Sequence, residues 1–307
     1  MYDGDAVPID SLDTVPNVSV IIPAFRAQRT LAVVLEALEA QVAMSDREVV
    51  LIDSGGAAYD SAAVVQRKCS WLRVISSPER MLPGQARNLG VSVAHGELLA
   101  FLDADTIPQL GWLDALEGAL GPGVEMVAGA VLDGTPHDHW GSIGYILEFM
   151  EWLPERRAPL SHAAGCNLLV RRASLERVGG FPEDMWPGED TVLTAPFAAR
   201  GTLVYAPAAQ VIHLNRVSRR EVLTHQRRLG ASWVQVCARV PMRGNRLAVP
   251  RLAPIAVAGR ILSLIRQSRC QPGATRRLVS QFPLLLVGLM AWGAGVLRPL
   301  NRSWADR

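Results

Sequence analysis

The stretch Gly96-Glu-Leu-Leu-Ala-Phe-Leu-Asp-Ala-Asp-Thr106 joins a short apolar run to two carboxylates. Residues 98–102 are all apolar, which predicts a strand buried on both faces, and Pro108 prevents its continuation. Ligands of open α/β sheets bind beyond the carboxyl ends of the strands. Asp103 and Asp105 therefore predict a site for Mg²⁺ or Mn²⁺, ions that bind carboxylates together with substrate phosphates, although a solvated turn would give the same pattern.

The segments before this stretch alternate between two kinds of apolar spacing. Strands are predicted over 18–23, 48–53 and 72–76, and helices over 30–41 and 84–94. Strands that alternate with helices favour a sheet of parallel strands with helices on its faces. The expected fold class is therefore α/β, with a Rossmann-like, mostly parallel sheet flanked by helices.

Charge is distributed unevenly along the chain. Residues 1–214 carry 14 Lys and Arg against 27 Asp and Glu, a net charge of −13, whereas residues 215–307 carry 17 Arg against two acids, a net charge of +15. A strongly basic segment indicates an anionic partner. Because the same segment is also strongly apolar, a membrane surface is favoured over nucleic acid.

The apolar segment 278–297 contains only Ser280 and Gln281 as polar residues. A helix needs about 20 apolar residues to cross a bilayer, so the segment is expected to span a membrane, re-enter it or lie on it. Arginines flank it on both sides, and charge therefore assigns no orientation. A buried helix of a soluble protein is the alternative.

The N-terminus and the cysteines bear on the cellular compartment. Residues 1–16 contain four aspartates and lack the basic and apolar pattern of a signal peptide, so they are predicted to be an acidic leader. The four cysteines lie far apart without a Cys-x-x-Cys pair, which is typical of reduced thiols in the cytosol. With the basic tail, these features predict a protein on the cytoplasmic side of the cell membrane.

Seven short motifs follow one another between Val18 and Arg228. They are Val18-Ser-Val-Ile-Ile-Pro-Ala-Phe25, Leu51-Ile-Asp-Ser-Gly-Gly56, Gly84-Gln-Ala-Arg-Asn-Leu-Gly90, Phe101-Leu-Asp-Ala-Asp105, Gly165-Cys-Asn167, Val178-Gly-Gly-Phe181 and Gly188-Glu-Asp190. As an ordered set they resemble the motifs of family 2 glycosyltransferases with the GT-A fold, of the bacterial membrane-associated type. The resemblance implies an acidic leader over 1–16, a GT-A domain over 17–228, and a basic, apolar, membrane-associating region over 229–307.

The resemblance implies an enzyme that transfers a sugar, with inversion, from a nucleotide diphospho-sugar to a hydroxyl group. A UDP-sugar is the favoured donor, a lipid-linked molecule of a cell-envelope glycan is one candidate acceptor, and Mg²⁺ or Mn²⁺ is the implied cofactor. Processive members carry a Gln-x-x-Arg-Trp motif, where this chain has His225-Gln-Arg-Arg-Leu229. That departure argues against a synthase that extrudes a polymer.

Several residues are implied by the resemblance to contact the nucleotide-sugar. They are Pro23, Ala24, Phe25, Asp53, Gly84, Arg87, Asp103 and Ala104. Asp53 would accept a hydrogen bond from the base, or it caps the following glycine turn. Arg87 suits a diphosphate because its guanidinium presents paired donors, although a helix-surface arginine is the alternative.

The metal ligands are also implied by the resemblance. Asp105 would bind the ion directly, and Asp103 would contact the ribose or reach the ion through water. His213 would complete the metal shell, and imidazole suits Mn²⁺ better than Mg²⁺. A packed histidine in an apolar strand is the alternative for His213.

The acceptor side is implied by the motif around Asp190. Asp190 would be the general base that takes a proton from the acceptor hydroxyl, with Glu189 as the alternative. Trp186 and Gly188 would form part of the acceptor wall. Acids at a helix start also complement the helix dipole, which is the structural alternative for both carboxylates.

Two other functions are compatible with parts of the pattern. A nucleotidyltransferase also combines a parallel sheet with acidic metal ligands, but it usually needs a glycine-rich loop after the first strand, and residues 23–29 contain no glycine. A non-catalytic membrane scaffold derived from a glycosyltransferase would be marked by lost acids. Asp103, Asp105 and Asp190 are all present.

Overall fold

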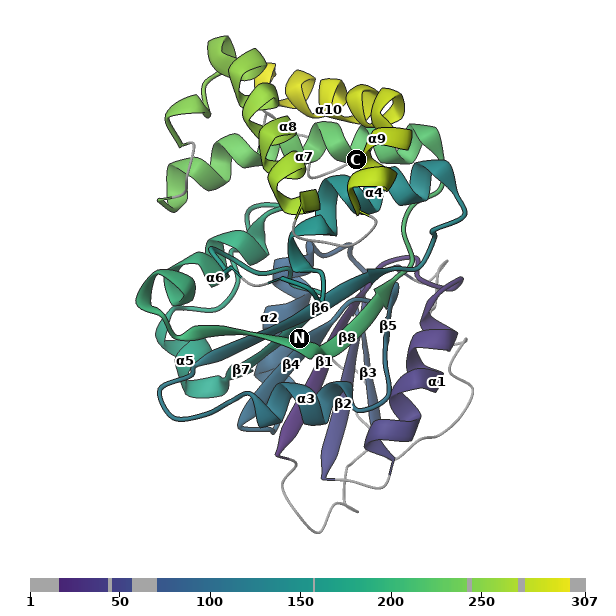
Figure 1. Ribbon diagram of the computed structural model, residues 1–307. Helices are drawn as coiled ribbons and strands as arrows, with labels where there is room; N and C mark the ends of the chain where they lie inside the picture. The colour runs from purple at the N-terminus through teal and green to yellow at the C-terminus, as the bar shows by residue number, and fades with distance from the viewer. Residues whose placement is uncertain are drawn as a thin grey trace.

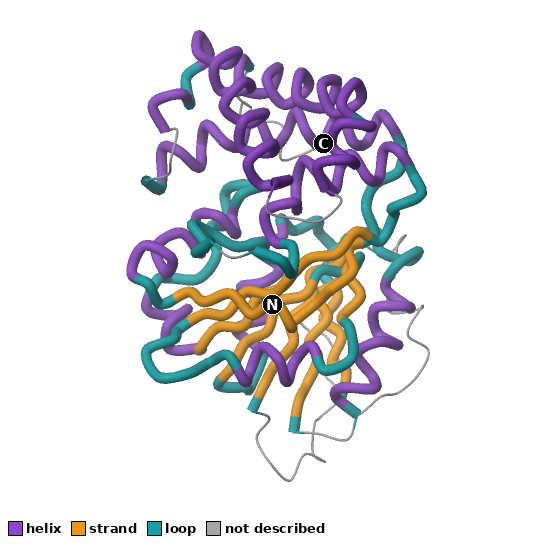
Figure 2. Tube along the Cα trace, in the orientation of Figure 1, coloured by secondary structure: helices purple, strands orange, loops and turns teal. Residues whose placement is uncertain are grey.

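A computed structural model describes residues 17–43, 46–56, 71–156, 158–241, 245–269 and 274–298. The predicted acidic leader lies outside these residues. An eight-stranded sheet forms one half of the molecule, and a layer of helices lies above it (Figures 1 and 2). The strand order is β3-β2-β1-β4-β7-β6-β8-β5.

The first half of the sheet is parallel. It contains β1 (Val18–Ala24), β2 (Arg47–Asp53), β3 (Leu72–Ser76) and β4 (Leu98–Leu102). Most side chains of β1, β2 and β4 are buried, as their uninterrupted apolar sequences predict. The register pairs β1 with both β2 and β4, so the residues that follow these three strands meet at one edge of the sheet.

The second half of the sheet is mixed. It contains β5 (Thr106–Pro108), β6 (Met126–Asp133), β7 (Asn167–Arg171) and β8 (Leu203–His213). β7 runs antiparallel between β4 and β6, β6 pairs with β8 in parallel, and β5 pairs with β8 in antiparallel orientation. The α/β class and the flanking helices are confirmed, and antiparallel pairing is confined to β7 and β5.

Helices cover the sheet and carry two of the predicted motifs. They are α1 (Leu31–Val42), α2 (Pro83–Val93), α3 (Trp112–Gly118), α5 (Arg172–Arg177) and α6 (Glu189–Arg200). α2 begins with a proline, which fits the first helical turn because its missing N–H would have no partner there. α6 begins after Gly188, whose φ of 102° suits a residue without a Cβ.

The remaining helices form a separate layer at one end of the sheet (Figure 1). They are α4 (His139–Phe149), α7 (Arg219–Arg239), α8 (Ala253–Arg269), α9 (Ala274–Ser280) and α10 (Phe282–Leu297), with 3₁₀ turns at Met150–Trp152, Asn245–Leu247 and Pro250–Leu252. An ion pair between Arg277 of α9 and Asp133 ties this layer to the carboxyl end of β6. The helical layer therefore covers the edge of the sheet at which the predicted site lies.

Helices α7 and α10 pack with their backbones in close contact. A Cβ on Gly230 would lie 1.9 Å from the carbonyl oxygen of Trp292, and one on Gly295 would lie 2.0 Å from that of Arg227. The apolar segment 278–297 is divided between α9 and α10. Among the described residues, no helix combines the length and the apolar character that crossing a membrane requires.

Candidate active site

The carboxylates after β4 lie beside a histidine from the end of β8. β5 follows Asp105 directly and pairs with β8 so that Thr106 lies opposite His213. As a result, Nε2 of His213 lies 3.7 Å from Oδ1 of Asp105. The ring of His213 is buried and packs 4.4 Å from that of Phe149, whereas about a third of the Asp105 side chain is exposed.

Hydrogen bonds on its other side fix the orientation of His213. Nδ1 of His213 lies 3.0 Å from Oδ1 of Asn215. The amide nitrogen of Asn215 donates to Asp133 and to Thr135, each at 2.9 Å, so its oxygen faces the imidazole and accepts a hydrogen bond from Nδ1. In this tautomer Nε2 carries no hydrogen, and its lone pair is on the side of the ring that faces Asp105.

The pair of Asp105 and His213 fits a divalent metal ion. Neighbouring ligand atoms of one octahedral ion at about 2.1 Å lie about 3 Å apart. The two atoms of this pair lie 3.7 Å apart, so a small inward movement of the partly exposed Asp105 would bring both to one ion. One carboxylate and one imidazole suit Mn²⁺, and substrate phosphates and water would supply the remaining ligands. Within the described part of the chain, no cluster of three or more His, Cys, Asp or Glu side chains is arranged to hold a metal on its own.

Arg87 joins Asp103 to Glu189. Its two terminal nitrogens donate to Oδ1 of Asp103 at 2.8 Å and to Oε1 of Glu189 at 2.7 Å. Only 3% of the Arg87 side chain is exposed, and its guanidinium also packs 5.1 Å from the centre of the Phe181 ring. The predicted diphosphate contact of Arg87 stays a prediction, but the structure places both ends of its fork on carboxylates.

Glu189 is the buried member of the Glu189–Asp190 pair. Burial raises the pKa of the Glu189 carboxyl, the neighbouring charge of Asp190 raises it further, and Arg87 opposes both effects. Oε2 of Glu189 is buried and has no hydrogen-bond partner among the described residues. A carboxylate enclosed in this way is suited to holding Arg87 and has little access to an acceptor.

Asp190 is partly exposed and firmly oriented. Its Oδ2 accepts the backbone N–H of Gly165 at 2.9 Å, and its Oδ1 accepts that of Thr191 at 2.6 Å. Burial raises the pKa of the Cys166 thiol, and so do the charges of Asp103, Asp105 and Asp190, in that order. Gly165, next to Cys166, packs against both Asp190 and Arg87, and Arg87 binds Asp103, so acids from two separate motifs lie close to one another.

The residues that were predicted to contact the nucleoside lie at the carboxyl ends of β1 and β2. Asp53 is buried, and its carboxylate accepts the backbone N–H of Gly55 at 2.9 Å, which is the turn-capping interaction that was the alternative to base contact. Phe25 is partly exposed, and the guanidinium of Arg80 lies 4.7 Å from its ring centre. Pro23 and Ala24 complete the end of β1, next to Asp53 in the register.

Two of the predicted nucleotide-sugar residues have a packing role. A Cβ on Gly84 would lie 2.2 Å from the carbonyl oxygen of Pro182, so this glycine lets the start of α2 approach that loop. Ala104 is buried between the two acids of the metal motif. Neither observation tests donor contact, which stays a prediction for both residues.

The loop before α6 packs against α7. A Cβ on Gly188 would lie 2.7 Å from Val236 and 2.8 Å from Ser232, so glycine is required where the loop meets this helix. The ring of Trp186 lies 6.1 Å from that of His225, and the guanidinium of Arg228 lies 5.3 Å from the Trp186 ring centre. The predicted acceptor wall of Trp186 and Gly188 is therefore built against α7.

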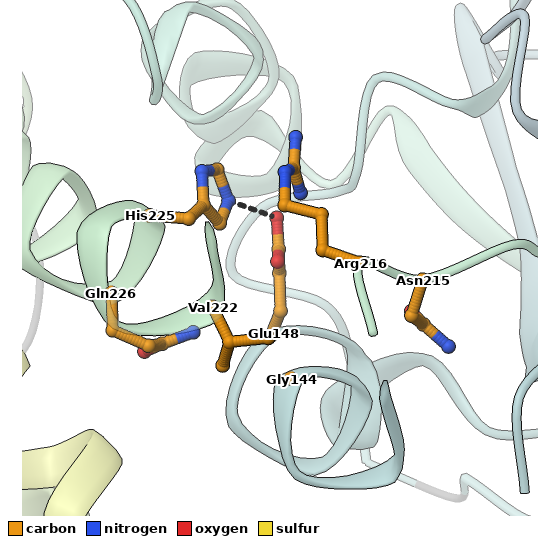
Figure 3. A pocket seen from close by; sticks show the side chains of 7 residues that line it. All are labelled: Gly144, Glu148, Asn215, Arg216, Val222, His225 and Gln226. Atoms are coloured by element: carbon orange, nitrogen blue, oxygen red, sulfur yellow. Dashed lines mark hydrogen bonds and ion pairs between the residues drawn. The ribbon is translucent and has the colours of Figure 1, made fainter. Parts of the chain in front are cut away.

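A polar pocket lies between α4 and α7 (Figure 3). Nε2 of His225 lies 3.0 Å from Oε1 of Glu148, and the two side chains point toward each other, with Arg216 beside them. Burial raises the pKa of Glu148, but the combined effect of His225, Arg216 and His213 is larger and lowers it to about 2. Glu148 is therefore ionised and holds His225 at the side of the predicted acceptor wall.

Sequence reasoning missed this polar group. Glu148 and His225 lie 77 positions apart on two amphipathic helices, and neither belongs to one of the seven motifs. Burial lowers the pKa of the Arg228 guanidinium, and the positive charges of Arg80 and Arg216 lower it further. Arg228 packs over Trp186 of the predicted acceptor wall, a contact that the helical spacing of the basic residues alone did not indicate.

Comparison with known proteins gives consistent matches. A profile of the family described as Glycosyl transferase family 2 matches residues 19–179. Glycosyltransferase AglE of Haloferax volcanii is 30% identical over 230 residues, covering 73% of this chain and 75% of that protein. The pre-mycofactocin glycosyltransferase of Mycobacterium tuberculosis is 28% identical over 220 residues, covering 69% of this chain but only 45% of that protein. The chain thus spans less than half of the mycobacterial relative.

Solved structures share the fold at lower sequence identity. A mannosyltransferase from Pyrobaculum calidifontis, in complex with GDP-Man and Mn²⁺, superposes with a TM-score of 0.61 at 21% identity and covers 94% of this chain and 89% of its own. Glucosyl-3-phosphoglycerate synthase from Mycobacterium tuberculosis, in complex with Mn²⁺, UDP-glucose and phosphoglyceric acid, gives 0.52 at 22% identity, with 75% and 82% covered.

Proposed function

The chain belongs to glycosyl transferase family 2, and from this premise we propose that it moves a sugar from a nucleotide diphospho-sugar to a hydroxyl group, with inversion at the anomeric carbon. The observation that carries the proposal is the arrangement at the carboxyl end of β4, where Arg87 holds Asp103 and packs with Asp190 against Gly165, and where His213 faces Asp105. Family membership also sets aside the nucleotidyltransferase alternative.

Asp190 is the proposed base. A single in-line displacement with inversion needs one group that takes the proton from the acceptor hydroxyl. Asp190 is suited to this because two backbone N–H groups orient its carboxylate while part of it stays open to solvent. Glu189, enclosed and paired with Arg87, is suited to orienting Asp103 instead.

Asp105 and His213 would hold a divalent cation, and Mn²⁺ is favoured by the imidazole. When bound, such an ion neutralises the charge that develops on the departing diphosphate. The chain's own contribution is to fix the two donor atoms, through the β5–β8 pairing on one side and the hydrogen bonds of Asn215 on the other. Arg80, which packs over Phe25, and Arg228, which packs over Trp186, add positive charge that suits an anionic donor.

The donor and the acceptor are proposed by class only. The two neighbouring structures carry GDP-Man and UDP-glucose, so either base is compatible with this fold, and the UDP preference suggested by Asp53 remains a proposal. A hydroxyl acceptor, with a lipid-linked one as the candidate, fits the wall formed by Trp186 and α7.

A screen of nucleotide-sugars tests the proposed function. We expect one donor to raise the thermal unfolding temperature of the full chain in the presence of Mn²⁺ and to be hydrolysed slowly to the nucleoside diphosphate. The matched variant Asp105→Asn should lose both effects while its unfolding temperature without ligand stays close to that of the wild type. Hydrolysis at an unchanged rate in excess chelator would contradict the role of the metal. The absence of any stabilising donor would instead favour the non-catalytic scaffold.

A further inference from the structure

Two buried polar side chains of α7 lack hydrogen bonds that burial normally requires. Gln226 is only 1% exposed and His225 only 6%. Oε1 and Nε2 of Gln226, and Nδ1 of His225, have no hydrogen-bond partner among the described residues. An unpartnered buried polar atom destabilises the fold, and an apolar side chain of the same size would avoid that cost. These atoms therefore indicate that a further molecule binds beside them.

Both residues line the pocket between α4 and α7 (Figure 3). His225, Glu148 and Arg216 lie together in this view, with Gln226 on one side of them and Asn215 on the other. The space has about the volume of one water molecule, and 23% of the Glu148 side chain in its wall is exposed. The pocket therefore suits one hydroxyl group of a larger molecule that lies outside it.

The polar groups of the pocket suit a neutral hydroxyl better than a charged or an apolar group. A hydroxyl both donates and accepts hydrogen bonds. The Gln226 amide can do the same, the Glu148 carboxylate accepts, and the Arg216 guanidinium donates. A phosphate or a carboxylate would meet the negative charge of Glu148, and an apolar group would leave the Gln226 amide without partners.

The pocket lies on the acceptor side of the proposed active site. The ring of Trp186, in the predicted acceptor wall, lies 6.1 Å from that of His225. Asn215 lines the pocket and also forms a hydrogen bond with His213, one of the proposed metal ligands. The predicted nucleoside residues lie instead at the ends of β1 and β2, which β4 and β7 separate from β6 and β8 in the sheet. A molecule in the pocket is therefore better placed to be the acceptor than the nucleotide.

We infer that the pocket binds a hydroxyl group of a sugar acceptor and that Gln226 is a specificity-determining residue. The inference rests on the proposed function and names its acceptor class. The hydroxyl that receives the sugar must lie at Asp190, the proposed base, so a hydroxyl held by Gln226 is a second one on the same molecule. A neutral acceptor with several hydroxyls is a sugar or a similar polyol. A site built to hydrogen-bond a substrate hydroxyl rejects molecules that lack it, because its own polar groups then stay unpaired.

Binding of small glycosides to the full chain tests the inference. Methyl glycosides of glucose, galactose, mannose and N-acetylglucosamine are titrated by ligand-observed NMR, with and without Mn²⁺ and UDP or GDP, and inorganic phosphate is titrated in parallel. We expect at least one glycoside to bind. Gln226→Leu should weaken that binding by about tenfold, because the amide supplies both a donor and an acceptor. The unfolding temperature of this variant should stay the same or rise, since the change removes buried atoms that have no partner.

Gln235→Leu is the matched control, because Gln235 belongs to the same helix and does not line the pocket. It should leave glycoside binding unchanged. Donor affinity, measured calorimetrically with Mn²⁺, should be the same for both variants and the wild type. Gln226→Met, with a flexible side chain, repeats the measurement in case the branched leucine disturbs the packing of α7.

The inference is overturned if no glycoside binds, or if Gln226→Leu weakens the binding of phosphate or of the donor instead. It is also overturned if Gln226→Leu lowers the unfolding temperature and leaves glycoside binding intact, as loss of a structural water would. Failure of the proposed function has a different signature, the absence of donor binding and hydrolysis, whereas glycoside binding is measured without turnover. Methyl and octyl glycosides of one sugar, compared below the micelle concentration, separate the two sources of such an acceptor. Tighter binding of the octyl form supports a lipid-linked sugar, equal binding supports a free one, and both results support the inference.

Discussion

Arg87 sets the geometry of the two carboxylates on either side of it. Because it is buried and binds Asp103 with one terminal nitrogen and Glu189 with the other, neither carboxylate can move without leaving a buried charge unpaired. Glu189 thereby fixes the start of α6, where Asp190 follows it in sequence. The carboxylate that holds Arg87 and the carboxylate that is proposed as the base are thus adjacent residues with different exposure.

The assignment of the base gives the first prediction. Asp190→Asn should lower transfer by about 10²–10⁴-fold, the usual contribution of a positioned base, with donor affinity within a few-fold of the wild type. Donor affinity is measured calorimetrically with Mn²⁺ present, and transfer is measured with the donor found in the screen. Asparagine keeps the size of the side chain, so the fold should be retained.

Glu189→Gln is the matched comparison for Asp190→Asn. It removes the charge that faces Arg87, so it should lower the unfolding temperature, which Asp190→Asn should leave nearly unchanged. If Asp190→Asn transferred sugar at the wild-type rate while Glu189→Gln did not, the two roles would be reversed.

For single residues, the sequence indicated which polar side chains belong to the site better than it indicated which side chains they contact. Asp105 and His213 were both proposed as metal ligands, and the structure places them 3.7 Å apart although 108 positions separate them. The β5–β8 pairing that brings them together could not be predicted, because a three-residue strand carries too little pattern. The contact of Arg87 with Glu189 was missed because it depends on how α2 and α6 pack against each other, which a local pattern does not encode.

Helix α9 connects the helical layer to His213, one of the two proposed metal ligands. Arg277 forms an ion pair with Asp133 and donates to Ser142 of α4, and Asp133 accepts from Asn215, which orients His213. Partners behind a metal-binding histidine fix its ring and its tautomer. A helix outside the sheet thus takes part in positioning the imidazole.

Removing the arginine of this connection gives the second prediction. Arg277→Gln should weaken Mn²⁺ binding by up to about tenfold, less than the loss of a ligand, because Asp133 and then Asn215 lose their fixed positions. The matched control is Arg276→Gln on the same helix, where the side chain is exposed. Mn²⁺ affinity measured calorimetrically with a nucleoside diphosphate present decides the matter. Equal affinities for the two variants would contradict the connection.

The contact between α7 and α10 gives the third prediction. Gly230→Ala places a Cβ against the backbone of Trp292, which cannot move aside as a flexible side chain would, so it should cost about 1–3 kcal/mol of unfolding free energy or more. Gly259→Ala on α8 meets no atom within 4 Å and should stabilise the chain by about 0.5–1 kcal/mol. Denaturant unfolding of both variants measures the difference. Similar values for the two would mean that α7 and α10 do not approach as closely as described.

The molecule as a whole combines a sheet, whose strand ends carry the site, with a helical layer that covers them. The parallel strands and their helices were predictable because their apolar periods are strong and local. The sequence divides the chain at residue 228, within α7, whereas the structure runs that helix on to Arg239 and packs α10 against it. Composition indicated the apolar, basic character of the tail correctly, but it does not encode which side of each helix is covered by another.

This arrangement leads to the last prediction, which concerns removal of the tail. A chain that ends at Arg239 lacks α8, α9 and α10, and it therefore exposes the apolar face of α7, where Trp233 packs 5.2 Å from Trp292. It also lacks Arg277 and with it the support of Asp133. We expect a lower unfolding temperature, a tendency to aggregate, and weaker Mn²⁺ binding than in the full chain. If the catalytic region is instead an independent domain, as the predicted boundary at 228 implies, the shortened chain should keep the unfolding temperature and the donor affinity of the full chain. Thermal unfolding and calorimetry on the two chains separate these outcomes.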